Sequence, residues 1–268
     1  MELSDQHAII EKKDHILLVQ LNRPEKKNAL SPDMLINVYD AWRELDEDDN
    51  LRCAIITGTK DVFCAGADLT AMYSGDQGSK EIIKRMETVP DLHWQALLRH
   101  NRPYKPIIAA VEGFALAGGT EFLHGTDIRV AAETATFGLT EAKRGLFPLG
   151  GATVRIRRQI PYTLAAEMLL TGRRITADEA KEYGLIGHVV PEGKSLDKAF
   201  ELARQIVENS PVAIKAIMKS LRDLGEGIPE EEALKKELEL GWPVFESDDS
   251  KEGLAAFAEK RTPKFTGK

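Results

Sequence analysis

The chain has 268 residues, 43% of them hydrophobic and 29% charged, so it is long enough to bury the core of one large domain. A formal net charge of -7 excludes an overall basic field for nucleic acid, and no apolar run approaches the roughly 20 residues of a membrane span. The first ten residues, MELSDQHAII, lack the basic and apolar regions of a secretion signal, so we expect a cytoplasmic protein.

Short apolar runs in the first two thirds of the chain predict buried strands. Ser31 and Pro32 have the chemistry of a helix start, and the apolar side chains that follow them share one helix face. Strands that are covered on both faces read as continuous apolar runs, which is typical of α/β proteins. The predicted strands cover residues 16–22, 53–58, 106–113 and 127–132, with a weaker candidate at 187–190.

The C-terminal part has a different pattern. Thr176 and Glu179 match a capping box at the start of a helix. From Leu196 onward the pattern is helical throughout, so we divide the chain into an α/β part at 1–195 and a helical part at 196–268. The helices expected there run to about residue 208, from 211, over 231–240 and from 250.

The two cysteines, Cys53 and Cys64, have ten residues between them and form no CxxC pair. This favours two reduced structural thiols over a disulfide or a metal pair. HExxH, the P-loop and zinc-like Cys/His spacings are missing from the sequence, so neither a metal nor ATP is indicated.

The stretch GFALAGGTEFL suggests a site because an apolar strand ends where a glycine pair opens a helix. The first turn of a helix has unpaired backbone N–H groups, and glycine allows a ligand to approach them. The Gly118 N–H is therefore a candidate donor to a developing oxyanion. Glu121 lies in the same turn, where it either takes part in chemistry or only complements the helix dipole.

Two further stretches carry candidate residues. In FCAGADL, small residues expose backbone that either offers a second N–H donor or forms a simple tight turn, and Asp68 is a candidate cap for the next helix. In FGLTEAKRGLFPLGG, Glu141 precedes an apolar, glycine-rich run, and burial there would raise its pKa to suit general acid catalysis. The alternative is a surface glutamate beside Lys143 and Arg144. Together, two backbone donors and two glutamates suit a carbonyl substrate whose oxygen becomes negative during the reaction.

In this order and spacing, these residues resemble the enoyl-CoA hydratase/isomerase (crotonase) superfamily over nearly the whole chain. The resemblance rests on LNRPEKKNALSPDM, FCAGADL, GFALAGGTEFLHGTDIRVAAETATFGLTEAKRGLFPLGG, LLTGRRITADEAKEYGLIGHVV and EGLAAFAEKR. It implies an α/β fold built as a crotonase-like spiral of ββα units, closed by a helical C-terminal trimerisation region. It also implies a homo-trimer or a dimer of trimers.

The resemblance assigns the oxyanion hole to the N–H groups of Ala67 and Gly118, and the hydratase acids to Glu121 and Glu141. Both acids are present, which favours the hydration of a trans-2-enoyl-CoA to a 3-hydroxyacyl-CoA. An enoyl-CoA isomerase or another acyl-CoA lyase of the family stays open as the alternative.

The resemblance also implies a CoA site. Lys26 and Lys27 match positions that contact the nucleotide phosphates, and Ala65, Asp68 and Leu69 lie along the path of adenine and pantetheine. Phe257 and Lys260 match positions that reach CoA from a neighbouring subunit. Coenzyme A is part of the substrate, so no separate cofactor is expected.

The chain departs from the frequent family pattern at Ala117, Thr120 and Leu149, which puts the acyl substrate in question more than the reaction. The segment 68–86 is expected to border the acyl pocket. Two alternatives outside the family are disfavoured: GFALAGG is not the GxGxxG of a dinucleotide-binding oxidoreductase, and the acidic balance does not support RNA binding.

Overall fold

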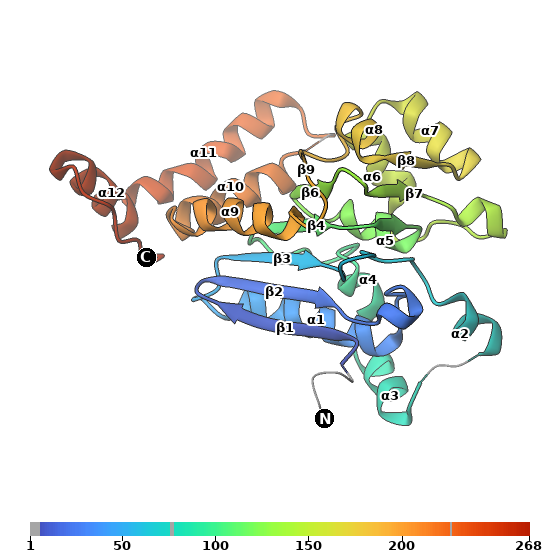
Figure 1. Cartoon of the computed structure of the whole chain (residues 1–268). Coiled ribbons are helices and arrows are strands. Elements are labelled where there is room, and N and C mark those ends of the chain that lie inside the picture. Colours follow the sequence, from blue (N-terminus) through green and yellow to red (C-terminus); the bar gives the residue numbers. More distant parts are fainter. Residues whose placement is uncertain (1–5, 76–77, 226) are drawn as a thin grey trace.

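The computed structural model describes residues 6–75, 78–225 and 227–268, and a six-stranded sheet lies at its centre (Figure 1). β1 and β2 form an antiparallel hairpin, whereas every later pair of neighbours in this sheet is parallel. β3 and β4 are buried at every position, as expected for strands covered on both faces. In spatial order the strands are β1 (Ala8–Lys13), β2 (Ile16–Leu21), β3 (Cys53–Thr57), β4 (Ile107–Val111), β6 (Ile128–Ala132) and β9 (His188–Val190).

Helices cover the two faces of this sheet. α1 (Pro32–Glu47) begins after Ser31, whose side chain accepts a hydrogen bond from the Met34 N–H, as its cap chemistry predicts. On β2, Leu17 and Val19 pack in the cluster that contains α1, whereas the alternating residues Ile16 and Leu18 pack in the cluster that contains α9. α9 (Ser195–Val207) contacts β3, β4 and β6 on that second face.

A second, three-stranded sheet connects the first sheet to the predicted site. It pairs β5 (Phe114–Leu116) with β7 (Thr136–Gly138) in parallel, and β7 with β8 (Arg174–Thr176) in antiparallel orientation. The chain turns from β4 into β5 at Gly113, which has a φ of 60°, and a Cβ there would lie 1.9 Å from the Asp61 carbonyl oxygen. Only glycine fits this turn. β5 leads directly into α5 (Gly118–Leu123), and β7 leads into the 3-10 helix η3 (Glu141–Arg144).

The remaining elements surround these two sheets. They are η2 (Pro24–Lys26), α2 (Leu69–Ser74), α3 (Lys80–Thr88), α4 (Leu92–Ala96), α6 (Ala152–Gln159), α7 (Tyr162–Thr171) and α8 (Ala177–Glu182). Thr176 forms the predicted capping box with Glu179 at the start of α8. Cys53 and Cys64 are free and buried, and burial raises the pKa of the Cys64 thiol to about 12.

Three helices follow α9 and extend away from the sheets (Figure 1): α10 (Pro211–Asp223), α11 (Glu230–Glu246) and α12 (Asp248–Glu259). The last one was expected from residue 250 but begins at Asp248, because Ser247 caps it. These helices leave many large apolar side chains exposed. The set comprises Ile217, Leu221, Leu234, Leu238, Trp242, Phe245, Leu254 and Phe257.

The predicted α/β class and the helical C-terminal region are confirmed. The division at residues 195 and 196 stays a prediction, and the helix that begins at this point packs on the central sheet. In the part of the chain that the structure describes, no helix is long and apolar enough to cross a membrane. Two expectations from the sequence fall partly outside the described residues. The residues not described are 1–5 at the start of the chain, where no secretion signal was expected, and 76 and 77 in the segment expected to border the acyl pocket.

Candidate active site

The loop after β3 presents the first predicted donor. Gly66 has a φ of 93°, and its carbonyl accepts a 2.8 Å hydrogen bond from the Leu30 N–H. Ala65 donates its N–H to the Lys27 carbonyl at 3.0 Å, which anchors the loop on its other side. Ala67 is exposed, and its N–H donates to no acceptor among the described residues. This amide is therefore available to a ligand.

The turn between β5 and α5 presents the second donor. Ala117 has φ 50° and ψ −124°, a backbone conformation that residues with a Cβ rarely adopt, and it donates its N–H to the Gly138 carbonyl at 2.7 Å. The next amide, that of Gly118, donates to no acceptor in the described chain. The strained turn thus leaves this N–H available at the start of α5.

The two donors lie side by side, although fifty residues separate them in sequence. A Cβ built on Gly118 would lie 3.7 Å from the Ala67 nitrogen, and one built on Gly66 would lie 3.0 Å from the Gly118 nitrogen. A side chain at Gly66 would also meet Ala117 Cβ at 2.8 Å. The glycines allow this close approach, so two available N–H groups lie near each other.

Glu121 is buried in the first turn of α5 and faces the turn before α6. Its Oε1 accepts a hydrogen bond from the Ala152 N–H at 3.2 Å. A Cβ on Gly150 would lie only 2.7 Å from Oε2, so a side chain there would displace this carboxylate. Burial raises the pKa of Glu121, while the backbone amides of this turn and the charge of Arg99 oppose that rise. Glu121 therefore does more than complement a helix dipole.

Glu141 begins η3 and is also buried, which rules out the surface glutamate that the sequence left open. Its Oε2 is inaccessible to solvent and has no hydrogen-bond partner in the described structure. Burial raises its pKa to about 7, and the negative charge of nearby Glu121 contributes to the rise. A carboxyl group with this pKa is close to half protonated at neutral pH and can donate a proton.

Thr120, at the start of α5, forms hydrogen bonds to both β5 and β7. Its buried hydroxyl donates to the Ala115 carbonyl at 2.6 Å and accepts from the Gly138 N–H at 3.2 Å. The Gly138 carbonyl also accepts the Ala117 N–H, so the N–H and the carbonyl of Gly138 both bond to the segment that carries the Gly118 amide. Three residues after Gly138 the chain reaches Glu141. The sequence marked Thr120 only as a departure from the family pattern, because its partners are distant in the chain.

Lys26 and Lys27 are exposed and lie on the turn that bonds to the first donor loop through Lys27 and Ala65. Asn28, which the sequence did not single out, is fully buried and donates to the Val62 and Phe63 carbonyls at 3.0 and 3.1 Å. An asparagine in a turn is compatible with its φ of 51°, but nothing in the local sequence indicates these partners.

Asp68 caps α2 by accepting hydrogen bonds from the Thr70 and Ala71 N–H groups, as its position predicted. Its other oxygen pairs with Arg23 at 2.7 Å, and this pairing lowers the pKa of Asp68. Leu69, the first residue of α2, is 44% exposed next to the donor loop. Asp68 and Leu69 follow Ala67 directly in the chain, and Ala65 bonds to Lys27, so the structure links these predicted residues through the donor loop.

Phe257 and Lys260 are not brought to this surface within one protomer. Phe257 is 86% exposed on α12, at the opposite end of the molecule from α2, and Lys260 ends that helix (Figure 1). Their predicted role depends on a neighbouring subunit. Across the described ranges, no group of three His, Cys, Asp or Glu side chains is arranged to hold a metal ion.

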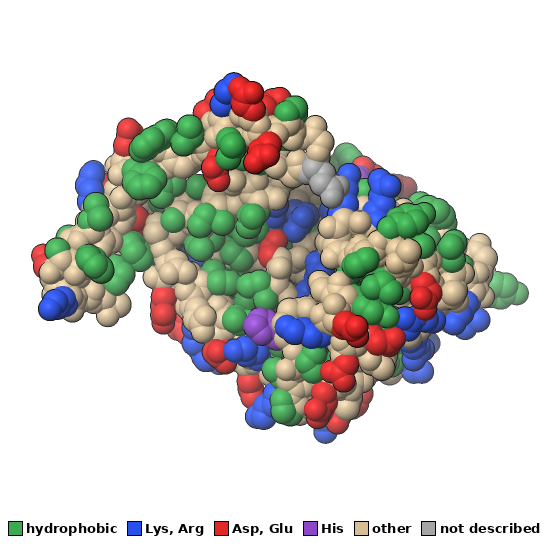
Figure 2. All heavy atoms as spheres, turned by 90° about the horizontal axis from the view of Figure 1, so that it is seen from above, with side chains coloured by type: hydrophobic (Ala, Val, Ile, Leu, Met, Phe, Trp, Pro, Cys, Tyr) green, Lys and Arg blue, Asp and Glu red, His purple; other side chains and the backbone are tan. Residues whose placement is uncertain are grey.

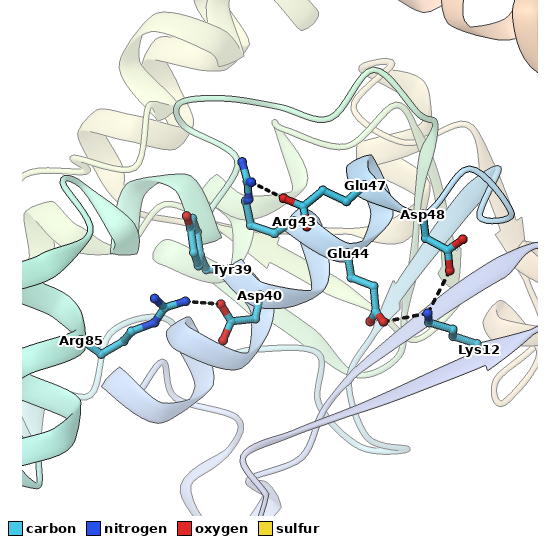
Figure 3. A pocket seen from close by; sticks show the side chains of 8 residues that line it. All are labelled: Lys12, Tyr39, Asp40, Arg43, Glu44, Glu47, Asp48 and Arg85. Carbon is cyan, nitrogen blue, oxygen red and sulfur yellow. Dashed lines mark hydrogen bonds and ion pairs between the residues drawn. The ribbon is translucent and has the colours of Figure 1, made fainter.

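A separate pocket between α1 and β1 contains none of the predicted site residues (Figure 3). Its charged side chains pair with one another: Lys12 with Glu44 and Asp48, and Arg85 with Asp40. Exposed ion pairs of this kind contribute little to stability. We therefore assign this pocket to the charged outer surface and not to the chemistry.

The mixed α/β fold thus holds two available N–H donors near each other, and two buried carboxyl groups follow them in α5 and η3. The family model for enoyl-CoA hydratase/isomerase matches residues 11–268, and the chain belongs to this family. The prediction made from the sequence motifs is thereby confirmed.

Similar proteins cover almost the whole chain. Enoyl-CoA hydratase EchA19 of Mycobacterium tuberculosis is 53% identical over 258 residues, which are 96% of each protein. The 2,3-dehydroadipyl-CoA hydratase of Escherichia coli is 36% identical and covers 97% of this chain and 98% of its own. The crystal structure of an enoyl-CoA hydratase from M. tuberculosis superposes with a TM-score of 0.89 at 38% identity, covering 98% of this chain and 100% of its own.

Proposed function

We propose that the protein is an enoyl-CoA hydratase that adds water to a trans-2-enoyl-CoA and forms a 3-hydroxyacyl-CoA. The observation that carries this proposal is the pair of buried glutamates beside two available N–H groups. Glu141 has an unpartnered oxygen and a pKa of about 7, and the charge of Glu121 acts on it directly. Hydration needs one group that takes a proton and one that gives a proton, and these two acids provide them.

In the proposed reaction, the thioester oxygen accepts hydrogen bonds from the Ala67 and Gly118 N–H groups. Glu121 takes a proton from water as the water oxygen forms a bond to C3. The π electrons of the double bond move toward C2 and the thioester oxygen, where the two amides stabilise the negative charge. Glu141 then gives its proton to C2. Glu121 ends protonated and Glu141 ionised, so a proton must return from one to the other or exchange with solvent before the next turnover.

The substitution Glu141→Gln tests this assignment. We expect kcat for hydration of crotonyl-CoA, followed by loss of its conjugated absorbance, to fall by orders of magnitude while acyl-CoA still binds. Glu133→Gln is the matched control, because Glu133 is exposed and lies outside the site. Near-normal hydration by Glu141→Gln would remove Glu141 from the mechanism.

An enoyl-CoA isomerase is the alternative within the family. Conversion of a 3-enoyl-CoA to the 2-enoyl isomer without hydration of crotonyl-CoA would favour it. A turnover panel of 2-enoyl-CoA substrates from C4 to C16 would then establish the acyl chain length.

The CoA site forms part of the same proposal. Lys26 and Lys27 would attract the nucleotide phosphates, with Ala65, Asp68 and Leu69 along the pantetheine path. Replacing both lysines by Gln should raise KM and leave kcat nearly unchanged, and the exposed Lys60→Gln serves as control. An unchanged KM in the double variant would exclude the two lysines from CoA binding.

We also propose a homo-trimer or a dimer of trimers, with a cytoplasmic location. The exposed apolar side chains of α10, α11 and α12 support self-association, because such patches rarely stay in contact with water. Phe257 and Lys260 would then reach the CoA of a neighbouring subunit. Light scattering in solution tests the mass, and a monomer would exclude that contact.

A further inference from the structure

Four arginines, Arg99, Arg102, Arg155 and Arg222, form a cluster, and two of them bond to the Asp127 carboxylate. Arg102 and Arg222 both bond to Asp127, at 3.0 and 2.9 Å, from the loop before β4 and from α10. Arg155 on α6 donates to the Arg99 carbonyl at 3.1 Å, which joins the other two members. Figure 2, which views the molecule from above Figure 1, shows basic side chains inside a central hollow of this surface.

The charges of this cluster do not balance. Arg155 is half-buried, and the charged groups that act on its pKa, Arg99 and Arg222, are both cations that lower it. The pKa of Arg102 is lowered to about 10, by burial first and then by Arg222 and Arg155, and only Asp127 opposes this. Arg102 and Arg222 therefore share the Asp127 carboxylate, and the charges of Arg99 and Arg222 also act on Glu121 and Asp46, respectively. Carboxylates are not among the groups that act on the pKa of Arg155 in the described structure.

The hydrogen bonds of the cluster are also incomplete. In the part of the chain that the structure describes, Arg222 has no partner for Nε and Nη1, although its side chain is only 9% exposed. Arg99 Nε, Arg102 Nε and Arg155 Nη1 are likewise buried without a partner. Buried cations that lack both counter-charge and acceptors are costly, and folded proteins normally pair them.

We propose that this arginine cluster binds an oxoanion, in the form of a carboxylate or a phosphate. The planar guanidinium fork matches two oxygen atoms of such a group, and Arg is favoured over Lys where the site is partly buried. Two sources share this chemistry: a free anion in solution and a carboxylate side chain of a second copy of the chain. The helix that carries Arg222, α10, also exposes the large apolar side chains Ile217 and Leu221. A second copy of the chain that packs on these apolar side chains could also cover the cluster.

The cluster lies behind the turn whose amide bonds to Glu121, and the charge of one member, Arg99, acts on that carboxylate. A Cβ on Gly151 would lie 3.8 Å from both Arg99 Cγ and Arg155 Cδ, and the next residue, Ala152, donates its N–H to Glu121. The inference goes beyond the proposed hydratase function and does not depend on it, because binding can be measured without turnover.

The test compares the full-length protein with Arg155→Gln, Arg155→Lys and Arg157→Gln. Arg157 is exposed on the same helix and is the matched control. Sodium phosphate is titrated against sodium chloride at constant ionic strength, with thermal unfolding and calorimetry as readouts. We expect saturable stabilisation by phosphate in the parent protein and in Arg157→Gln, at least tenfold weaker binding in Arg155→Gln, and a smaller loss in Arg155→Lys.

A second arm identifies the source. If phosphate does not bind but Arg155→Gln forms smaller assemblies than the parent and Arg157→Gln, the oxoanion is a carboxylate of a second copy. Circular dichroism confirms folding, and Arg155→Lys replaces any variant that does not fold. The proposal is overturned if phosphate binds the parent and Arg155→Gln equally. It is also overturned if no phosphate binds and the assembly mass is the same in every variant.

Discussion

Glu141→Gln should stabilise the folded protein at alkaline pH while it abolishes activity. The ordinary pKa of this carboxyl group is 4.5, and the fold raises it to about 7, because burial disfavours the charged form. Below its ordinary pKa the carboxyl group is protonated in both the folded and the unfolded protein, and the folded protein has its full stability. As the pH rises through 7, the group ionises in its buried position and the free energy of unfolding falls. Glutamine does not ionise, so the variant avoids the loss.

The magnitude follows from the shift. The pKa rises from 4.5 to about 7, a difference of 2.5. At about 1.36 kcal/mol for each pKa unit, ionisation lowers the free energy of unfolding by at most about 3.4 kcal/mol between pH 4 and pH 8. We expect roughly half of this, because the site must open to solvent where the substrate enters. For a chain of this length, that corresponds to a rise in Tm of about 3 to 7 °C.

The assay is thermal and urea unfolding of the parent protein and Glu141→Gln at pH 5 and pH 8. Glu133→Gln serves as the control, since Glu133 is exposed and its substitution should give the same small difference at both pH values. If the stability difference between the parent and Glu141→Gln does not grow with pH, the carboxyl group is not held in the environment that the structure describes.

Further predictions concern the same site. If Glu141 is the general acid, kcat should fall as pH rises above about 7, and a kcat that keeps rising through pH 8 would contradict this role. Thr120→Val should cost roughly 1 to 3 kcal/mol and lower kcat more than it raises KM, because it removes the bonds that hold Gly138, whereas Thr120→Ser should retain most activity. Gly150→Ala should reduce kcat at least tenfold by displacing the Glu121 carboxylate, with acyl-CoA binding as the control measurement. Ala117→Gly should relieve the strain of the positive φ, which would add about 1 kcal/mol to the free energy of unfolding and raise Tm. An unchanged or lower Tm would show that this turn is not strained.

Most of the central sheet could be predicted from local pattern. β2, β3, β4 and β6 are short and mostly apolar, and burial on both faces makes such runs easy to recognise. β1, whose second half is charged and exposed, was not predicted. β5, β7 and β8 were not predicted either, because three residues are too few to show a periodicity. These short strands nevertheless carry the chain to α5 and η3, where the candidate acids lie.

Local pattern in the sequence indicated Gly118, Glu121 and Glu141 as candidates, because glycines after a strand and glutamates near apolar runs have local chemical meaning. The choice of Ala67 as the second donor, and the roles of the two acids, came from the family resemblance. Only the tertiary structure decided that the Gly118 amide lies beside the Ala67 amide and that Glu141 is buried within the influence of Glu121. It also revealed Thr120 and Asn28 as supports and brought arginines from two segments, the loop before β4 and α10, to Asp127. Residues far apart in the chain become neighbours through the packing of sheets and helices, and the local pattern of a single sequence does not predict these contacts.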